Sequence, residues 1–296
     1  MGVILAIVGR ASSNENRSMS LGIATAAGSV GQMIGPPLAN YLLESMNWSI
    51  VFLLFSGLIL LSLFTLPMIR VSKKDYNPEY DMSMKKVLSN ALGDYSFTLI
   101  FLGFFSCGFQ LAFVTAHFPA FVTEVCGPIA QDSFLMSFGV SSTSALGAAA
   151  IALIGFANIG GTIFAGYLGK SYLKKDLLAF LYLGRTIVAA LFIILPMTPL
   201  TVVMFSLVMG LLWLAAIPLT SGLIAHIYGL KYMGTLYGIV FFCHQLGSFL
   251  GVWLGGYLYD LNGSYTIVWW VGVGFGAFSA LVHLPVRERP LNYSSA

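Results

Sequence analysis

Long apolar runs separated by short polar segments are the main feature of the chain. The runs lie at about 18–43, 49–69, 96–123, 144–169, 177–196, 199–225, 233–258 and 265–285. A membrane-spanning α-helix needs roughly 20 apolar residues to cross a hydrocarbon layer of about 30 Å, and each run meets that length. Membrane β-strands would show about ten residues of strict alternation, which these runs lack. The pattern predicts an all-α integral membrane protein with about eight full spans.

A shorter apolar stretch, residues 1–9, opens the chain. It is too short to cross a bilayer, and no basic segment precedes it as in a signal peptide. We expect it to be the end of a helix whose earlier part is missing from this sequence.

The composition agrees with a lipid environment. Apolar residues make up 58% of the chain and charged residues 8%, whereas soluble domains average about 25% charged residues. A net charge of +3 without a basic stripe argues against nucleic acid as a partner. Cys107, Cys126 and Cys243 form neither a disulfide framework nor a metal spacing, so we interpret them as packing residues and expect no metal or cofactor.

Lys and Arg gather in alternate loops, which predicts the orientation. If the chain crosses at every run, the loops near Glu44, 124–143, Met197 and Asp260 contain no Lys or Arg. The other loops are therefore predicted to be cytoplasmic, together with the C-terminus, in a plasma or bacterial inner membrane. These loops contain Arg10, Arg17, Arg70, Lys73, Lys74, Lys85, Lys86, Lys170, Lys174, Lys175, Lys231, Arg287 and Arg289.

The longest charged stretch, residues 70–95, divides the chain into two halves. We expect it to be a central cytoplasmic loop. Residues 1–69 would then be a remnant of an N-terminal bundle, 96–285 a six-helix bundle, and 286–296 a cytoplasmic tail.

Small residues recur at a spacing of four in several runs, a pattern that lets helix backbones approach closely in lipid. We expect close packing at Gly247, Gly251 and Gly255, at Gly31 and Gly35, at Gly234 and Gly238, at Gly161, Ala165 and Gly169, and at Gly272 and Gly276.

Prolines fall inside three runs, at Pro36 with Pro37, at Pro119 and at Pro218. A proline removes one backbone hydrogen bond, so we expect each of these helices to be interrupted.

Residues 17–31 place a basic residue before a Gly-x-Ala-x-Ala run, and Trp48 opens the next run. This arrangement resembles the fifth and sixth helices of the major facilitator superfamily, most closely the branch of monocarboxylate porters and oxalate–formate antiporters. The basic pair usual in that branch is Asn16-Arg17 here, and its Arg after the Trp is Ser49.

Two further segments extend the resemblance over nearly the whole chain. Residues 158–175 resemble the Gly-x-Leu-x-Asp loop between helices eight and nine of the family, although Lys170 replaces the Asp and departs from its charge-relay pattern. Residues 233–265 have the glycine and aromatic spacing of helix eleven in related bacterial carriers.

The resemblance implies a partial N-terminal half and a complete six-helix C-terminal half, without the first three family helices and most of the fourth. It implies secondary active transport of a small organic solute by alternating access. The closest branch suggests a monocarboxylate or similar anion, with proton coupling as a further expectation. Two alternatives stay open: an efflux carrier for a drug or another metabolite, and a truncated, inactive fragment.

One cation falls inside a span. Arg185 lies ten residues after Lys175, about 15 Å along a helix and near the midplane. Placing an arginine there costs roughly 2.5–3.5 kcal/mol, so it is a functional candidate by default. Its planar fork suits a carboxylate. It could also pair with a protein carbonyl or carboxylate, or extend to the cytoplasmic surface.

Polar side chains within other spans complete the candidate solute site. His117 and the pair His244-Gln245 stand out because histidine titrates near neutral pH and can relay protons. By resemblance, their helices, seven and eleven, line the central cavity. Each could equally be a buried hydrogen-bonding group. The remaining candidates are Gln110, Asn158 and Trp213.

An enzyme is not expected. No Ser/His/Asp constellation, no His-x-x-x-His pair and no phosphate-binding glycine loop is present in the sequence. No Asp or Glu falls in the middle of a run, so the runs offer no buried carboxylate as a proton carrier.

Overall fold

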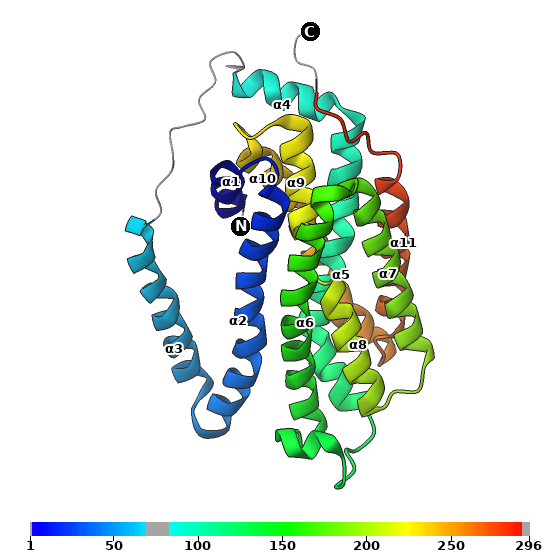
Figure 1. Ribbon diagram of the computed structural model, residues 1–296. Coiled ribbons are helices and arrows are strands. Elements are labelled where there is room, and N and C mark those ends of the chain that lie inside the picture. Colours follow the sequence, from blue (N-terminus) through cyan, green and yellow to red (C-terminus); the bar gives the residue numbers. More distant parts are fainter. Residues whose placement is uncertain (1, 69–82, 292–296) are drawn as a thin grey trace.

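The protein is a bundle of long helices in a computed structural model that describes residues 2–68 and 83–291 (Figure 1). In chain order the helices are α1 (Gly2–Ala11), α2 (Arg17–Ser45), α3 (Trp48–Leu61), the 3₁₀ helix η1 (Ser62–Met68), α4 (Met84–Gly93), α5 (Tyr95–Val125), the 3₁₀ helix η3 (Phe134–Phe138), α6 (Thr143–Ser171), α7 (Lys174–Ile194), α8 (Pro199–Leu212), α9 (Ala216–Tyr228), α10 (Met233–Asn262) and α11 (Thr266–His283). The all-α membrane fold predicted from the sequence is confirmed.

Within the described residues, seven helical segments are long and apolar enough to span a membrane, and six of them lie between Tyr95 and His283. The seventh, α3 with the start of η1, stands apart from the bundle, and only 6% of it is buried (Figure 1).

The run at 18–43 forms α2, which has the length of a span but is not among the seven. Ser, Thr, Asn and Gln side chains lower its hydropathy. Several of these polar groups face α6, where the Ser18 hydroxyl donates to the Gly169 carbonyl at 3.2 Å. The helix therefore buries Ser18 and Ser29 against α6, whereas Ser20, Gln32 and Asn40 stay partly exposed.

The run at 199–225 forms two helices, so the interruption predicted for the run with Pro218 is confirmed. Trp213, Leu214 and Ala215 separate α8 from α9. Pro218 supplies part of the reason, because it has no N–H to bond the carbonyl of Leu214 four residues earlier. That carbonyl instead accepts the N–H of Ile217 at 2.9 Å, in a tighter turn.

The other predicted interruptions are wrong. The helix α2 runs through Pro36 and Pro37, and α5 runs through Pro119. A proline removes one bond of the helical ladder, and a membrane helix with neighbours tolerates that loss.

Close helix packing is confirmed at several of the predicted small residues. A Cβ added to Gly247 or Gly251 on α10 would collide with backbone carbonyls of α5, and one added to Gly161 would collide with Leu211 on α8. The prediction is wrong for Gly31, Gly35 and Gly238, around which the structure leaves open space.

Two segments near the predicted loop and tail are ordered against the bundle. The predicted loop at 70–95 lies partly outside the described residues, and its later part forms α4, which buries Val87 and Ala91 four residues apart. At the other end of the chain, the N–H of Leu291 donates to the Ile227 carbonyl at 2.9 Å.

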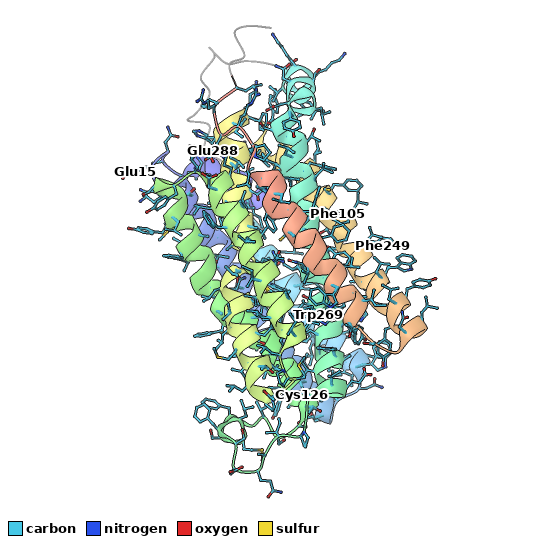
Figure 2. All side chains as sticks on the ribbon, turned by 90° about the vertical axis from the view of Figure 1, so that its right-hand side faces the viewer. Glu15, Phe105, Cys126, Phe249, Trp269 and Glu288 are labelled. Carbon is cyan, nitrogen blue, oxygen red and sulfur yellow. The ribbon has the colours of Figure 1, made fainter. Side chains whose placement is uncertain are left out.

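The basic loops gather at one end of the bundle. The Lys174 ammonium lies 3.4 Å from the Glu288 carboxylate at that end. At the opposite end, the Tyr259 hydroxyl donates to Glu124 at 3.0 Å. Figure 2 shows Glu288 at one end and Cys126 at the other. The alternation of loops inferred from charge therefore agrees with the fold.

Candidate functional site

Arg185 is fully buried at the middle of α7. Its Nη1 donates to the Cys107 thiol at 3.3 Å and to the backbone carbonyl of Trp213 at 3.5 Å. Its Nε and Nη2 have no hydrogen-bond partner among the described residues. The ion pairs among the described residues are made by Lys174 and Lys175, not by Arg185. In the described part of the chain, Arg185 is therefore a buried cation without a carboxylate counter-ion, and it does not extend to the surface.

Two aromatic rings flank the guanidinium. The rings of Tyr182 and Trp213 each lie 5.8 Å from the Arg185 carbon Cζ, within the range of cation–π attraction. Tyr182 precedes Arg185 by three residues on α7, so both occupy the same helix face. The Tyr182 ring stacks on His283 of α11 at 5.1 Å. The rings stabilise the cation but do not neutralise it.

Asn158 bonds the backbone at the break between α8 and α9. Its Oδ1 accepts the backbone N–H of Leu214 at 2.8 Å, and its Nδ2 donates to the Ser29 hydroxyl at 2.7 Å. Asn158 thus supplies the acceptor that the broken helix lacks at Leu214, while Arg185 donates to the carbonyl of Trp213 next to it. The break brings Arg185, Trp213 and Asn158 into one neighbourhood.

His244 lies on the α10 side of the same neighbourhood. Its ring is 5.1 Å from the Phe104 ring and 4.9 Å from the Phe241 ring. Nδ1 lies 3.1 Å from Oε1 of Gln245, whereas Nε2 is buried without a partner in the described chain. The His244 side chain also lies next to the Cys107 thiol.

His117 lies elsewhere along the bundle. Its Nε2 is 2.9 Å from the Val252 carbonyl of α10, and its ring is 5.3 Å from that of Tyr265. Val252 follows His244 by eight residues, or about 12 Å along the helix. The structure therefore does not bring His117 next to Arg185 and His244, and a shared cavity stays a prediction.

Gln110 joins α5 to α11. Its Nε2 donates to the Gly272 carbonyl at 2.8 Å, and its Oε1 has no partner among the described residues. Gln110 and Trp213 both line a cavity of about 10 Å³, which is no larger than a single water needs. A solute would have to widen this space.

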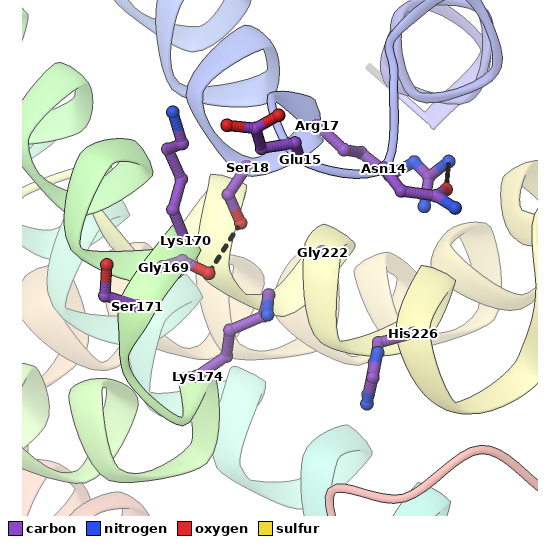
Figure 3. A pocket seen from close by; sticks show the side chains of 10 residues that line it. All are labelled: Asn14, Glu15, Arg17, Ser18, Gly169, Lys170, Ser171, Lys174, Gly222 and His226. Carbon is purple, nitrogen blue, oxygen red and sulfur yellow. Dashed lines mark hydrogen bonds between the residues drawn. The ribbon is translucent and has the colours of Figure 1, made fainter.

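A larger cavity of about 440 Å³ opens at the basic end of the bundle (Figure 3). The Lys170 ammonium there donates to the Asn16 side chain at 2.9 Å. The lining residues come from the start of α2, the α6–α7 junction and α9: Asn14, Glu15, Arg17, Ser18, Gly169, Lys170, Ser171, Lys174, Gly222 and His226. Its basic lining would attract an anion to this end.

Sequence reasoning missed Cys107 and Tyr182. The cysteine was interpreted as a packing residue, yet it contacts Arg185. The sequence does hold a signal for both residues, because a residue three positions before a candidate lies on the same helix face. Cys107 precedes Gln110 by three positions, and Tyr182 precedes Arg185 by three.

Comparisons with known proteins agree with the helical architecture. The chain is 27% identical over 191 residues to an uncharacterized MFS-type transporter, YcxA, of Bacillus subtilis (strain 168). That match covers 63% of this chain and 43% of the relative, so it spans less than half of the relative's length.

Solved structures share the fold at low sequence identity. The fucose:proton symporter FucP of E. coli, in a variant form, superposes with a TM-score of 0.66 at 12% identity, over 95% of this chain and 72% of that one. FucP in the outward conformation gives 0.65 at 13% identity, over 95% and 71%.

The sequence profile of the Major Facilitator Superfamily matches residues 1–252, which is most of the chain. Members of this family are transporters rather than enzymes, and the spans described above make the chain a multi-pass membrane protein. The chain belongs to the Major Facilitator Superfamily.

Proposed function

We propose that this chain carries a small organic anion across the membrane by alternating access, as a secondary transporter. The observation that supports the proposal is Arg185, fully buried with two of its guanidinium nitrogens lacking a partner in the described chain. An unpaired buried cation is costly, and a bound anion would compensate that cost. The substrate-free protein would then hold an unpaired positive charge, which the bound anion would neutralise.

Charge counting supports a singly charged substrate such as a monocarboxylate. Among the described spans, Arg185 is the one Lys or Arg away from the helix ends. A monocarboxylate would balance that charge through a two-point contact with the planar guanidinium. A dicarboxylate would bring a second negative charge into an apolar core, where it would lack a cation.

Proton coupling is a further part of the proposal, with His244 as its carrier. The His244 ring lies next to Cys107, which in turn contacts Arg185. Protonated histidine offers two donors and a positive charge. A bound anion would therefore favour protonation of His244, and protonation would favour the anion. His117 and Gln245 stay candidates for the solute path.

Uptake by reconstituted protein tests this function. Purified protein in liposomes is supplied with radiolabelled formate, acetate or lactate, with succinate and a neutral sugar as comparison solutes. We expect saturable uptake of a monocarboxylate and a loss of about tenfold or more in Arg185→Gln. Lys85→Gln changes an exposed cation on α4 and should leave uptake unchanged. Equal uptake by Arg185→Gln and the unmodified protein would overturn the proposal.

A further inference from the structure

Four side chains around Cys107 carry buried polar atoms that no described residue satisfies. These atoms are Nε and Nη2 of Arg185, the hydroxyls of Tyr182 and Tyr237, and Nε2 of His244. Arg185, Tyr182 and Tyr237 are fully buried, and His244 is 5% exposed. Buried polar groups in folded proteins nearly always have partners, so several unsatisfied groups in one place need an explanation.

The four groups come from two helices that face Cys107 of α5. Arg185 and Tyr182 reach it from α7, with Nη1 of Arg185 3.3 Å from the thiol. Tyr237 and His244 reach it from α10, and the Phe104 ring of α5 lies 6.1 Å from the first ring and 5.1 Å from the second. The Tyr182 hydroxyl also lies near both the Cys107 thiol and the Tyr237 side chain.

The chemistry of this cluster matches a carboxylate. The guanidinium supplies two nitrogens with free N–H groups, and each tyrosine hydroxyl can supply one O–H donor. The acidic residues of these three helices, Glu124, Asp176 and Asp260, lie in the first or last turn of their helices and do not accept them. The thiol is at best a weak acceptor. A carboxylate has two oxygens with about four acceptor positions, which matches the two guanidinium donors and the two hydroxyls.

We propose that Tyr182 and Tyr237 bind the substrate carboxylate together with Arg185, at a site that adjoins Cys107. This inference rests on the proposed anion transport and names contacts for it. Bound carboxylate would accept both tyrosine hydroxyls and the free face of the guanidinium. His244 would lie beside it, in position to donate when protonated.

Tyr→Phe variants test the two hydroxyls with little disturbance. Tyr182→Phe and Tyr237→Phe each remove a hydroxyl that has no partner in the described structure, so the ligand-free protein should unfold at the same temperature or a higher one. Binding of formate or lactate is measured in detergent as ligand-dependent thermal stabilisation, which yields a Kd without any transport. We expect each variant to raise the Kd about tenfold, because hydrogen bonds to a charged group contribute that much. Tyr257→Phe, at an exposed position of α10, is the matched control and should leave the Kd unchanged.

The outcomes separate this inference from the proposed function. Weaker carboxylate binding in both variants, with unchanged ligand-free stability, supports the site even if liposomes show no transport. An unchanged Kd in both variants would overturn it, whether or not the protein transports carboxylates. Lower ligand-free stability with unchanged Kd would also overturn it, because the hydroxyls would then hold buried water. An absence of carboxylate binding by the unmodified protein would reject the site and the anion function together.

Discussion

The side chain of Asn158 on α6 accepts the backbone N–H of Leu214 at 2.8 Å, at the break between α8 and α9. The same amide donates to Ser29 of α2 at 2.7 Å. Asn158 therefore links α6 to α2. It also supplies an acceptor for the Leu214 N–H, which a continuous helix would bond to its own backbone.

Removal of this link should destabilise the protein. Asn158→Ala would leave the Leu214 N–H buried without its acceptor, at a cost of about 1–3 kcal/mol. We expect a lower unfolding temperature in detergent. Asn262→Ala is the matched control, because Asn262 makes one local bond to Leu258 at an exposed helix end. If the two variants unfold at the same temperature, Asn158 does not hold the break.

The contact of α5 with α10 predicts that two glycines of α10 differ sharply in how well they tolerate a larger side chain. A side chain at Gly251 would collide with the Phe109 carbonyl, whereas Gly238 has open space around it. Gly251→Val should therefore force the helices apart and lower the unfolding temperature by several degrees, in line with overpacking costs of about 1–3 kcal/mol. Gly238→Val carries the same change in helix propensity and should be near neutral. Equal effects would show that the helices do not approach as described.

The spans and the close contacts at Gly247 and Gly251 followed from sequence because apolar length and small-residue spacing report directly on a lipid environment. Pro218 predicted an interruption of its run, but not its place after Leu212 or the groups that stabilise it. The run at 199–225 stays apolar throughout, and the groups that stabilise the break, Asn158 and Arg185, come from other helices.

The candidate site was predictable only in part, for a similar reason. Arg185 and His244 stand out because charged or titratable groups are rare in spans. Tyr182, Tyr237 and Cys107 belong to residue types that usually pack, and the helical spacing of Cys107 and Tyr182 from polar candidates is a weaker signal than the convergence of all three in the structure. His117 is of the same type as His244, yet it lies against Val252 instead.

Cysteine labelling tests the orientation along a single helix. Lys231 lies two residues before the start of α10 and Asp260 lies near its end, and both are exposed. Of the loops predicted to be cytoplasmic, the one with Lys73 lies outside the described residues, so Lys231 represents that side. An impermeant thiol reagent added to intact cells should label Asp260→Cys and not Lys231→Cys.

Background labelling in that experiment should be low. Cys107, Cys126 and Cys243 are all buried. Burial also raises the pKa of the Cys126 thiol, at the end of α5, and so reduces its reactive thiolate. Labelling of Lys231→Cys from outside the cell, with Asp260→Cys protected, would reverse the proposed orientation.

Protonation of His244 should make anion uptake dependent on pH, with a definite sign. Protonated His244 would add a positive charge beside Arg185, so carboxylate should bind more tightly as the pH falls. Uptake in liposomes should rise about fivefold or more between pH 8 and pH 5.5, since couplings of this kind are typically 1–3 kcal/mol. His244→Ala should flatten the profile, whereas His226→Ala, at the basic end, should keep it. If both His117→Ala and His244→Ala retain the full pH dependence, neither histidine couples protons to transport. Arg185 could then still bind the anion, but the proton would have to be carried by a group outside these spans.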